Sequence, residues 1–118
     1  MDIEVAFSGV PVTELAAAQD FFERLFGAPP DILVNENEVM WRVADTAWLY
    51  VVVDPARAGR ALVAVSVPDL DAALAELAGR GIEPAGVERV GDKERKATVV
   101  DPDGNSVALI EVQAGASG

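Results

Sequence analysis

The 118-residue sequence predicts an α+β fold in which two βαβββ modules form a curved mixed sheet around a cleft, with the helices on the convex face. The first observation is that the order of strand, helix and three further strands occurs twice along the chain. The second is that the copies align: Val12-Thr-Glu-Leu15 matches Val67-Pro-Asp-Leu70 at an offset of 55, and residues 45–50 match 103–108 at 58. An internal repeat of this kind constrains the fold strongly. Each module alone leaves one sheet face uncovered, and two modules side by side can curl these faces around a shared cavity. We expect one domain over residues 1–118, with modules at roughly 1–54 and 61–113.

The first module begins with a strand over residues 3–12, which are rich in β-branched and small side chains. Thr13 is expected to cap the helix that follows. Apolar residues then recur at helical spacing, namely Leu15, Ala18, Phe22, Leu25 and Phe26. Gly27 and the pair Pro29-Pro30 end this helix. Three short strands are predicted near 31–35, 38–43 and 47–53, and residues 55–60 form a polar connector.

The second module repeats the pattern, with a strand over 61–67 and a helix that opens at Pro68-Asp69 and ends near Arg80, with Gly81 as its C-cap. Strands are predicted near 82–87, 95–100 and 105–112, and the tail 113–118 is expected to fray. The run Asp101-Pro-Asp-Gly104 before the last strand has the composition of a turn. A calcium loop of the EF-hand type would need a glutamate where Val112 stands, so we interpret the run as a hairpin turn.

Composition limits the classes of function. The chain is 51% hydrophobic and has no cysteine, no signal-peptide pattern and no apolar run of membrane-spanning length, which predicts a globular, cytoplasmic protein. A formal net charge of −11 argues against nucleic acid as a partner. The same charge favours cationic small molecules or basic protein patches, although solubility alone also accounts for a low pI.

Several motifs carry a resemblance to a known family. Val10-Pro-Val12, Phe21-Phe22 and Leu25-Phe-Gly27 resemble the opening strand and helix of the vicinal oxygen chelate superfamily, and the stretch Val63–Ala73 resembles its second module. Asp101-Pro-Asp-Gly-Asn105 is the most specific match, and the resemblance covers nearly the whole chain. The superfamily contains glyoxalase I, extradiol dioxygenases, fosfomycin-modifying enzymes and bleomycin-resistance proteins, so the fold by itself does not determine the chemistry.

The resemblance also implies where a metal would bind. In the family, His, Glu or Gln side chains from four strands hold the metal on the concave sheet face. The equivalent positions here are Phe7, Tyr50, Leu62 and Ala108, and the chain has no histidine. These residues do not make a divalent site, and Glu111 lies on the opposite face by strand alternation. We therefore expect no metal and no cofactor, and neither metal-dependent glyoxalase nor dioxygenase activity.

A small-molecule pocket is expected on the same concave face. Strand alternation places Phe7, Trp48, Tyr50, Leu62 and Ala108 there, beside the small residues Gly9 and Ala64, which leave room. The same alternation turns Leu49 and Val51 toward the helices as core. Trp41 is a further candidate ligand-binding residue. The sequence does not determine which face of the strand Trp41 and Arg42 occupy, or whether Arg42 and Arg95 reach the cleft or only the solvent. The alternative is that the large side chains simply fill the cavity as a second core.

Two functions from different classes follow. The first is a metal-free homodimer that binds a planar, hydrophobic small molecule with a cationic or neutral polar end, and so sequesters a drug or metabolite as the bleomycin-resistance members do. The second is a metal-independent lyase, isomerase or cyclase acting on a bulky natural product. Tyr50 is the one candidate for a reactive group in the cavity, and no catalytic residue is assigned. A third possibility is a degenerate module that serves only in association.

Overall fold

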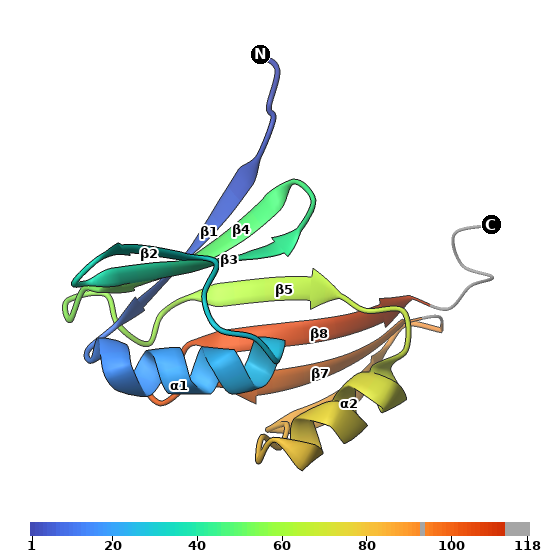
Figure 1. The fold of residues 1–118 in the computed structure, drawn as a ribbon. Coiled ribbons are helices and arrows are strands. Elements are labelled where there is room, and N and C mark those ends of the chain that lie inside the picture. Colours follow the sequence, from blue (N-terminus) through green and yellow to red (C-terminus); the bar gives the residue numbers. More distant parts are fainter. Residues whose placement is uncertain (93, 113–118) are drawn as a thin grey trace. The chain divides into compact units, whose positions relative to one another are not determined.

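The computed structural model describes residues 1–92 and 94–112, so Lys93 and the tail predicted to fray lie outside the described residues. The chain forms two compact units (Figure 1). The first unit comprises Met1–Ala61 together with Asp101–Asn105, and the second comprises Leu62–Val100 and the chain from Ser106 onward. Each unit has one four-stranded mixed sheet and one helix, in the order predicted. The α+β class and the repeated βαβββ pattern are therefore confirmed.

The first unit contains β1 (Ala6–Val12), α1 (Leu15–Phe26), β2 (Ile32–Asn35), β3 (Glu38–Ala44) and β4 (Ala47–Val53), coloured from blue to green in Figure 1. Its strands lie in the order β1-β4-β3-β2. β1 pairs with β4 in parallel, and the other two pairings are antiparallel. The long crossover that a parallel pair requires is provided by α1 and the β2–β3 hairpin.

Helix α1 covers one face of this sheet. Its buried residues are Ala18, Phe21, Phe22 and Leu25, and the buried residues of the sheet are Val10, Val12, Val39, Trp41, Leu49 and Val51. Gly27 ends the helix in a left-handed conformation (φ 74°), and its N–H donates to the Glu23 carbonyl at 2.8 Å. The prediction that Thr13 caps α1 is wrong, because Glu14 occupies the N-cap position without a side-chain bond. Thr13 instead donates its hydroxyl to Asp103 at 2.7 Å.

The second unit contains β5 (Leu62–Ser66), α2 (Leu70–Gly79), β6 (Gly86–Val90), β7 (Glu94–Val100) and β8 (Ser106–Val112). The strand order is β5-β8-β7-β6, and β5 pairs with β8 in parallel. The strand predicted near 82–87 is wrong in position, since β6 begins only at Gly86. Ile82 is 5% exposed and its N–H donates to the Leu77 carbonyl at 2.9 Å, so it closes the end of α2 rather than starting a strand.

Charged groups hold the start of α2. The helix opens where it was predicted to, with Asp69 as the N-cap, and the Asp69 carboxylate accepts the Ala72 N–H at 3.0 Å. The predicted C-cap, Gly81, is wrong, because Arg80 occupies that position. Glu111 of β8 accepts the Leu70 N–H, so this glutamate lies on the helix side of the sheet, as strand alternation predicts. Arg95 of β7 pairs with Asp71 at 3.2 Å and with Glu111 at 3.5 Å. Because Asp71 lies in the first turn of α2, Arg95 is on the helix side of the sheet, and its hydrogen bond with Asp71 raises the pKa of Arg95.

Among the described residues, both helices are too short to cross a bilayer, with 12 residues in α1 and 10 in α2.

Candidate functional site

The first sheet has one face that α1 does not cover, and the large aromatic candidates lie on it. Strand register places Phe7 beside Trp48 and Gly9 beside Tyr50. Because residues paired across a sheet point to the same side, these side chains share one face, as predicted. Phe7 is 58% exposed, so this surface is accessible and is not packed as a second core within the unit.

Trp41 lies on the other face. It is 2% exposed, its indole N–H donates to the Ala28 carbonyl at 3.0 Å, and its ring lies 6.0 Å from Phe22 and 5.6 Å from Phe26 between centroids. A buried indole with its polar atom satisfied is a core residue. This placement argues against a ligand-binding role for Trp41.

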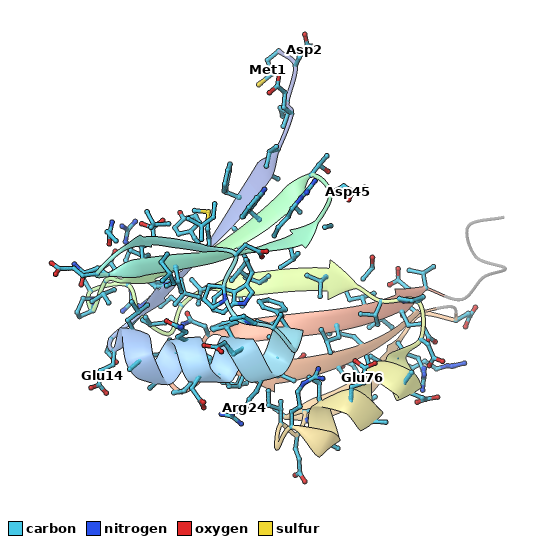
Figure 2. All side chains as sticks on the ribbon, viewed as in Figure 1. Met1, Asp2, Glu14, Arg24, Asp45 and Glu76 are labelled. Atoms are coloured by element: carbon cyan, nitrogen blue, oxygen red, sulfur yellow. The ribbon has the colours of Figure 1, made fainter. Side chains whose placement is uncertain are left out.

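Arg42, the neighbour of Trp41, points the opposite way. It pairs in register with Trp48 and is exposed. Its guanidinium donates to the carbonyl of Asp45 at 2.8 Å, in the β3–β4 turn that Asp45 marks in Figure 2. The Arg42 side chain therefore points toward the β3–β4 turn.

An open pocket of about 440 Å³ lies on the uncovered face. The strands contribute Gly9, Pro11, Tyr50 and Val52 to its wall, and the connector after β4 contributes Asp54, Arg57, Arg60 and Ala61. Of the predicted ligand-binding residues, Tyr50 is in this wall. The apolar strand floor and the charged connector give the pocket the mixed lining that small-molecule sites have.

The ring of Tyr50 lies directly over Gly9. A Cβ atom added at Gly9 would be 2.5 Å from both the Cζ and the hydroxyl oxygen of Tyr50, which is closer than real Cβ contacts. Glycine at this position is what allows the ring to cross from β4 to β1 and to form one side of the pocket. The sequence suggested that Gly9 leaves room in the cavity, and the structure shows that Tyr50 occupies that room.

The two arginines of the connector have different surroundings. The Arg57 Nε atom lies 2.7 Å from the Asp54 carboxylate, so this charge is already paired. Arg60 is exposed and forms no hydrogen bond or ion pair with any residue in the described parts of the chain. The pocket therefore presents one guanidinium whose hydrogen bonds are unused.

The loop Asp101–Asn105 belongs to the first unit and fixes the backbone around Arg60. Asn105 is fully buried, and its Oδ1 atom accepts the Ala61 N–H at 2.9 Å. On the other side, Gly59 has φ 85°, and a side chain there would collide with the Asp103 carbonyl oxygen.

The predicted turn in this loop is confirmed. The buried Asp101 carboxylate accepts the N–H groups of Asp103 and Asn105 at 3.0 and 2.8 Å and the Asn105 amide at 2.8 Å. The Asp103 carboxylate accepts the N–H and the hydroxyl of Thr13 at 3.1 and 2.7 Å. Both carboxylates thus act as acceptors that hold the loop in shape.

The remaining candidates lie in the second unit. Leu62 is 88% exposed, and with Ala64 and Ala108 it lines an open pocket of about 420 Å³ that also carries Lys96, Thr98 and Ser106. The Lys96 ammonium lies 3.2 Å from Glu88. The predicted residues therefore form two groups, one on each sheet. Arg57 and Arg60 were missed, although a polar connector with two arginines three residues apart was a visible signal.

The residues at the family's metal positions do not fit a metal. Phe7, Leu62 and Ala108 have no ligating atom, and the phenol of Tyr50 is the one oxygen among the four side chains. Within residues 1–92 and 94–112, no three His, Cys, Asp or Glu side chains are grouped so that they could hold a metal ion. The polar side chains that line the pocket of the first unit are those of Tyr50, Asp54, Arg57 and Arg60.

Comparison with known proteins defines the class. The family model of the glyoxalase/bleomycin resistance protein/dioxygenase superfamily matches residues 5–109, and the chain belongs to this superfamily. A comparison with curated proteins finds no match.

Solved structures agree with this assignment. The chain is 39% identical to a glyoxalase/bleomycin resistance protein from Catenulispora acidiphila, with a TM-score of 0.85 over 90% of this chain and 96% of the other. It is 25% identical to TnmS3, an antibiotic-binding protein from a Streptomyces species, with a TM-score of 0.73 over 92% and 95%. A bleomycin resistance determinant encoded on the transposon Tn5 is 20% identical and has a TM-score of 0.71 over 90% and 95%, which shows a shared fold.

Proposed function

We propose that the protein binds a hydrophobic, aromatic small molecule in the pocket of the first unit without the help of a metal, and thereby sequesters a drug or metabolite. The observation that carries the proposal is the open 440 Å³ pocket in which the Tyr50 ring lies over Gly9. TnmS3, which is described as an antibiotic-binding protein, supports the same class of function. A cytoplasmic location, expected from the cysteine-free sequence, is part of the proposal.

Aromatic rings supply the affinity in this proposal. Tyr50 is half-buried in the pocket wall. Phe7 and Trp48 form the neighbouring cross-strand pair on the same face of the sheet. A stacked aromatic contact contributes about 0.5–1.5 kcal/mol beyond its buried area. Truncation of an aromatic residue at the centre of a binding site often costs more than 1 kcal/mol. Contacts with two of these rings would therefore add about 1–3 kcal/mol to the binding free energy, which corresponds to a gain in affinity of roughly 5- to 150-fold.

The direct test is calorimetric titration of a panel of planar antibiotics into the wild-type protein and the Tyr50→Ala and Trp48→Ala variants. We expect each variant to lose about 1–3 kcal/mol of binding free energy and to keep the native circular dichroism spectrum. Phe26→Leu, a change in the helix-side aromatic cluster, is the control and should leave affinity unchanged. If neither Tyr50→Ala nor Trp48→Ala weakens any binder that is found, these rings do not form the ligand site.

The ligand recovered after binding distinguishes sequestration from catalysis. Sequestration predicts that mass spectrometry returns the ligand unchanged after prolonged incubation with the protein. A rearranged or cleaved product would support the alternative, a metal-independent lyase, isomerase or cyclase. In that case Tyr50→Phe, which keeps the ring and removes the phenol, should separate binding from turnover.

A twofold homodimer is also part of the proposal. The first unit exposes Phe7 (58%) and the edge strand β2 with Leu33 (71%), and the second exposes Leu62 (88%) on its edge strand β5. Exposed apolar side chains on sheet edges are commonly covered by association. Sedimentation equilibrium should show twice the chain mass at micromolar concentration. Detection of a 12.4 kDa species alone would refute this part.

A further inference from the structure

We infer that Arg60 makes the pocket of the first unit selective for an aromatic ligand that carries an anionic oxygen group, such as a carboxylate or a phenolate. The inference rests on the proposed function, since it concerns the same pocket. It is opposite to the cationic ligand that the net charge of −11 suggests.

The first step is the state of the charged groups in the wall. Asp54 and Arg57 are paired with each other at 2.7 Å, so their charges largely cancel at the pocket. Arg60 has no partner within residues 1–92 and 94–112. A guanidinium presents a planar fork of N–H donors that matches the two oxygens of a carboxylate, and charge-assisted bonds of this kind are the strong ones. The unpaired donor in the wall is thus suited to an anion.

The second step is that the backbone of Arg60 is held in place. Ala61 donates to the buried Asn105, and Gly59 lies so close to the Asp103 carbonyl oxygen that an added Cβ atom would collide with it, so the loop Asp101–Asn105 packs against both neighbours of Arg60. A charged side chain on a fixed backbone loses less freedom on binding than one on a free linker. Arg60 is therefore placed to meet a ligand that stacks on Tyr50, which lines the same pocket.

The third step is the relation between local and overall charge. At physiological ionic strength the Debye length is about 8 Å, so charges far from the pocket act weakly on a bound ligand. A guanidinium in direct contact is screened much less. The negative surface of the protein therefore slows the approach of an anion, while Arg60 decides how tightly the bound anion is held.

The test uses three probes that share one ring system: 2-naphthoate, 2-naphthalenemethanol and 2-naphthylmethylammonium. Each is titrated calorimetrically at 0.15 M salt into wild type and into the Arg60→Gln, Arg60→Lys and Tyr50→Ala variants. Arg89→Gln is the matched control, because Arg89 is an exposed arginine on β6 in the second unit.

We expect wild type to bind 2-naphthoate about tenfold more tightly than the ammonium probe, as a charge-assisted contact of this kind predicts. Arg60→Gln should remove about tenfold of the naphthoate affinity, Arg60→Lys should retain part of the preference, and the neutral alcohol should change by less than about twofold. Arg89→Gln should bind all three probes as wild type does.

Two other outcomes separate the inference from the proposed function. If all three probes bind equally, or the ammonium binds best, and Tyr50→Ala still weakens them, the aromatic pocket stands and the role of Arg60 is refuted. If no probe binds at millimolar concentration to wild type, both the pocket assignment and the inference are refuted.

Discussion

Replacing Asn105 by alanine should destabilise the protein strongly, because three groups lose their partner at once. The side chain is fully buried. Its amide donates to the Pro11 carbonyl at 2.8 Å and to the Asp101 carboxylate at 2.8 Å, and its oxygen accepts the Ala61 N–H at 2.9 Å. All three partners belong to the first unit.

The size of the effect follows from these bonds. A neutral hydrogen bond contributes about 1 kcal/mol net, and one to a charged group contributes about 1.5–3 kcal/mol. Two neutral bonds and one charged bond therefore give an expected loss of about 4 kcal/mol in the free energy of unfolding, before any entry of water into the space left. With a urea m-value of about 2 kcal/mol/M, the midpoint should fall by about 2 M.

Urea denaturation followed by tryptophan fluorescence measures this loss, because both tryptophans, Trp41 and Trp48, lie in the first unit. Asn35→Ala is the matched control. Asn35 forms one exposed bond, with its oxygen accepting the Asn37 N–H at 2.8 Å in the β2–β3 turn, and its loss should cost at most about 1 kcal/mol. If Asn105→Ala shifts the midpoint no more than Asn35→Ala does, the hydrogen bonds of Asn105 do not contribute about 4 kcal/mol to the stability of the first unit.

Three further predictions test separate features. Gly9→Ala should push the Tyr50 ring aside, since the new methyl would lie 2.5 Å from it, and should weaken aromatic binders about tenfold while the melting temperature changes little; unchanged affinity would contradict the Tyr50 geometry. Asp71→Asn should give a stability profile parallel to wild type between pH 6 and 10, because the raised pKa of Arg95 means that its contribution is complete below its unfolded pKa and is lost only at higher pH; curves that diverge within this range would count against the pairing. Zn²⁺, Ni²⁺, Fe²⁺ or Mn²⁺ added to tag-free protein should neither raise the melting temperature nor produce glyoxalase or dioxygenase activity, and stoichiometric metal that a chelator removes with loss of activity would overturn this.

The fold could be predicted from the sequence because its signals are local and occur twice. Helix α1 has apolar residues at regular spacing and a glycine at its end, and α2 begins with an aspartate cap. Strand alternation correctly separated the helix-facing residues Leu49 and Val51 from the open-face residue Tyr50. The position of β6 was missed because an apolar residue after a helix, Ile82, can close the helix as well as begin a strand.

The site was harder to predict because its geometry depends on residues distant in the sequence. Thr13 looked like a helix cap, but its partner Asp103 is 90 residues away. Alternation gave Trp41 a face without showing which face α1 covers. Arg60 lies in a connector without periodicity, and the role proposed for it rests on the loop that packs against its neighbours and on the absence of a partner within the described residues.

The assignment of Asp101–Asn105 to the first unit has a consequence for how such proteins diverge. These five residues fold with the first unit, although they lie in the second of the two sequence modules. A recombination event that joins two homologous genes near residue 61 would take Arg60 from one parent and Asn105, which anchors its neighbour Ala61, from the other. Selection on a new pocket in such a chimera would act on two distant stretches of the gene at once. Recombination would therefore transfer a working pocket less often than it transfers the strand pattern of either module.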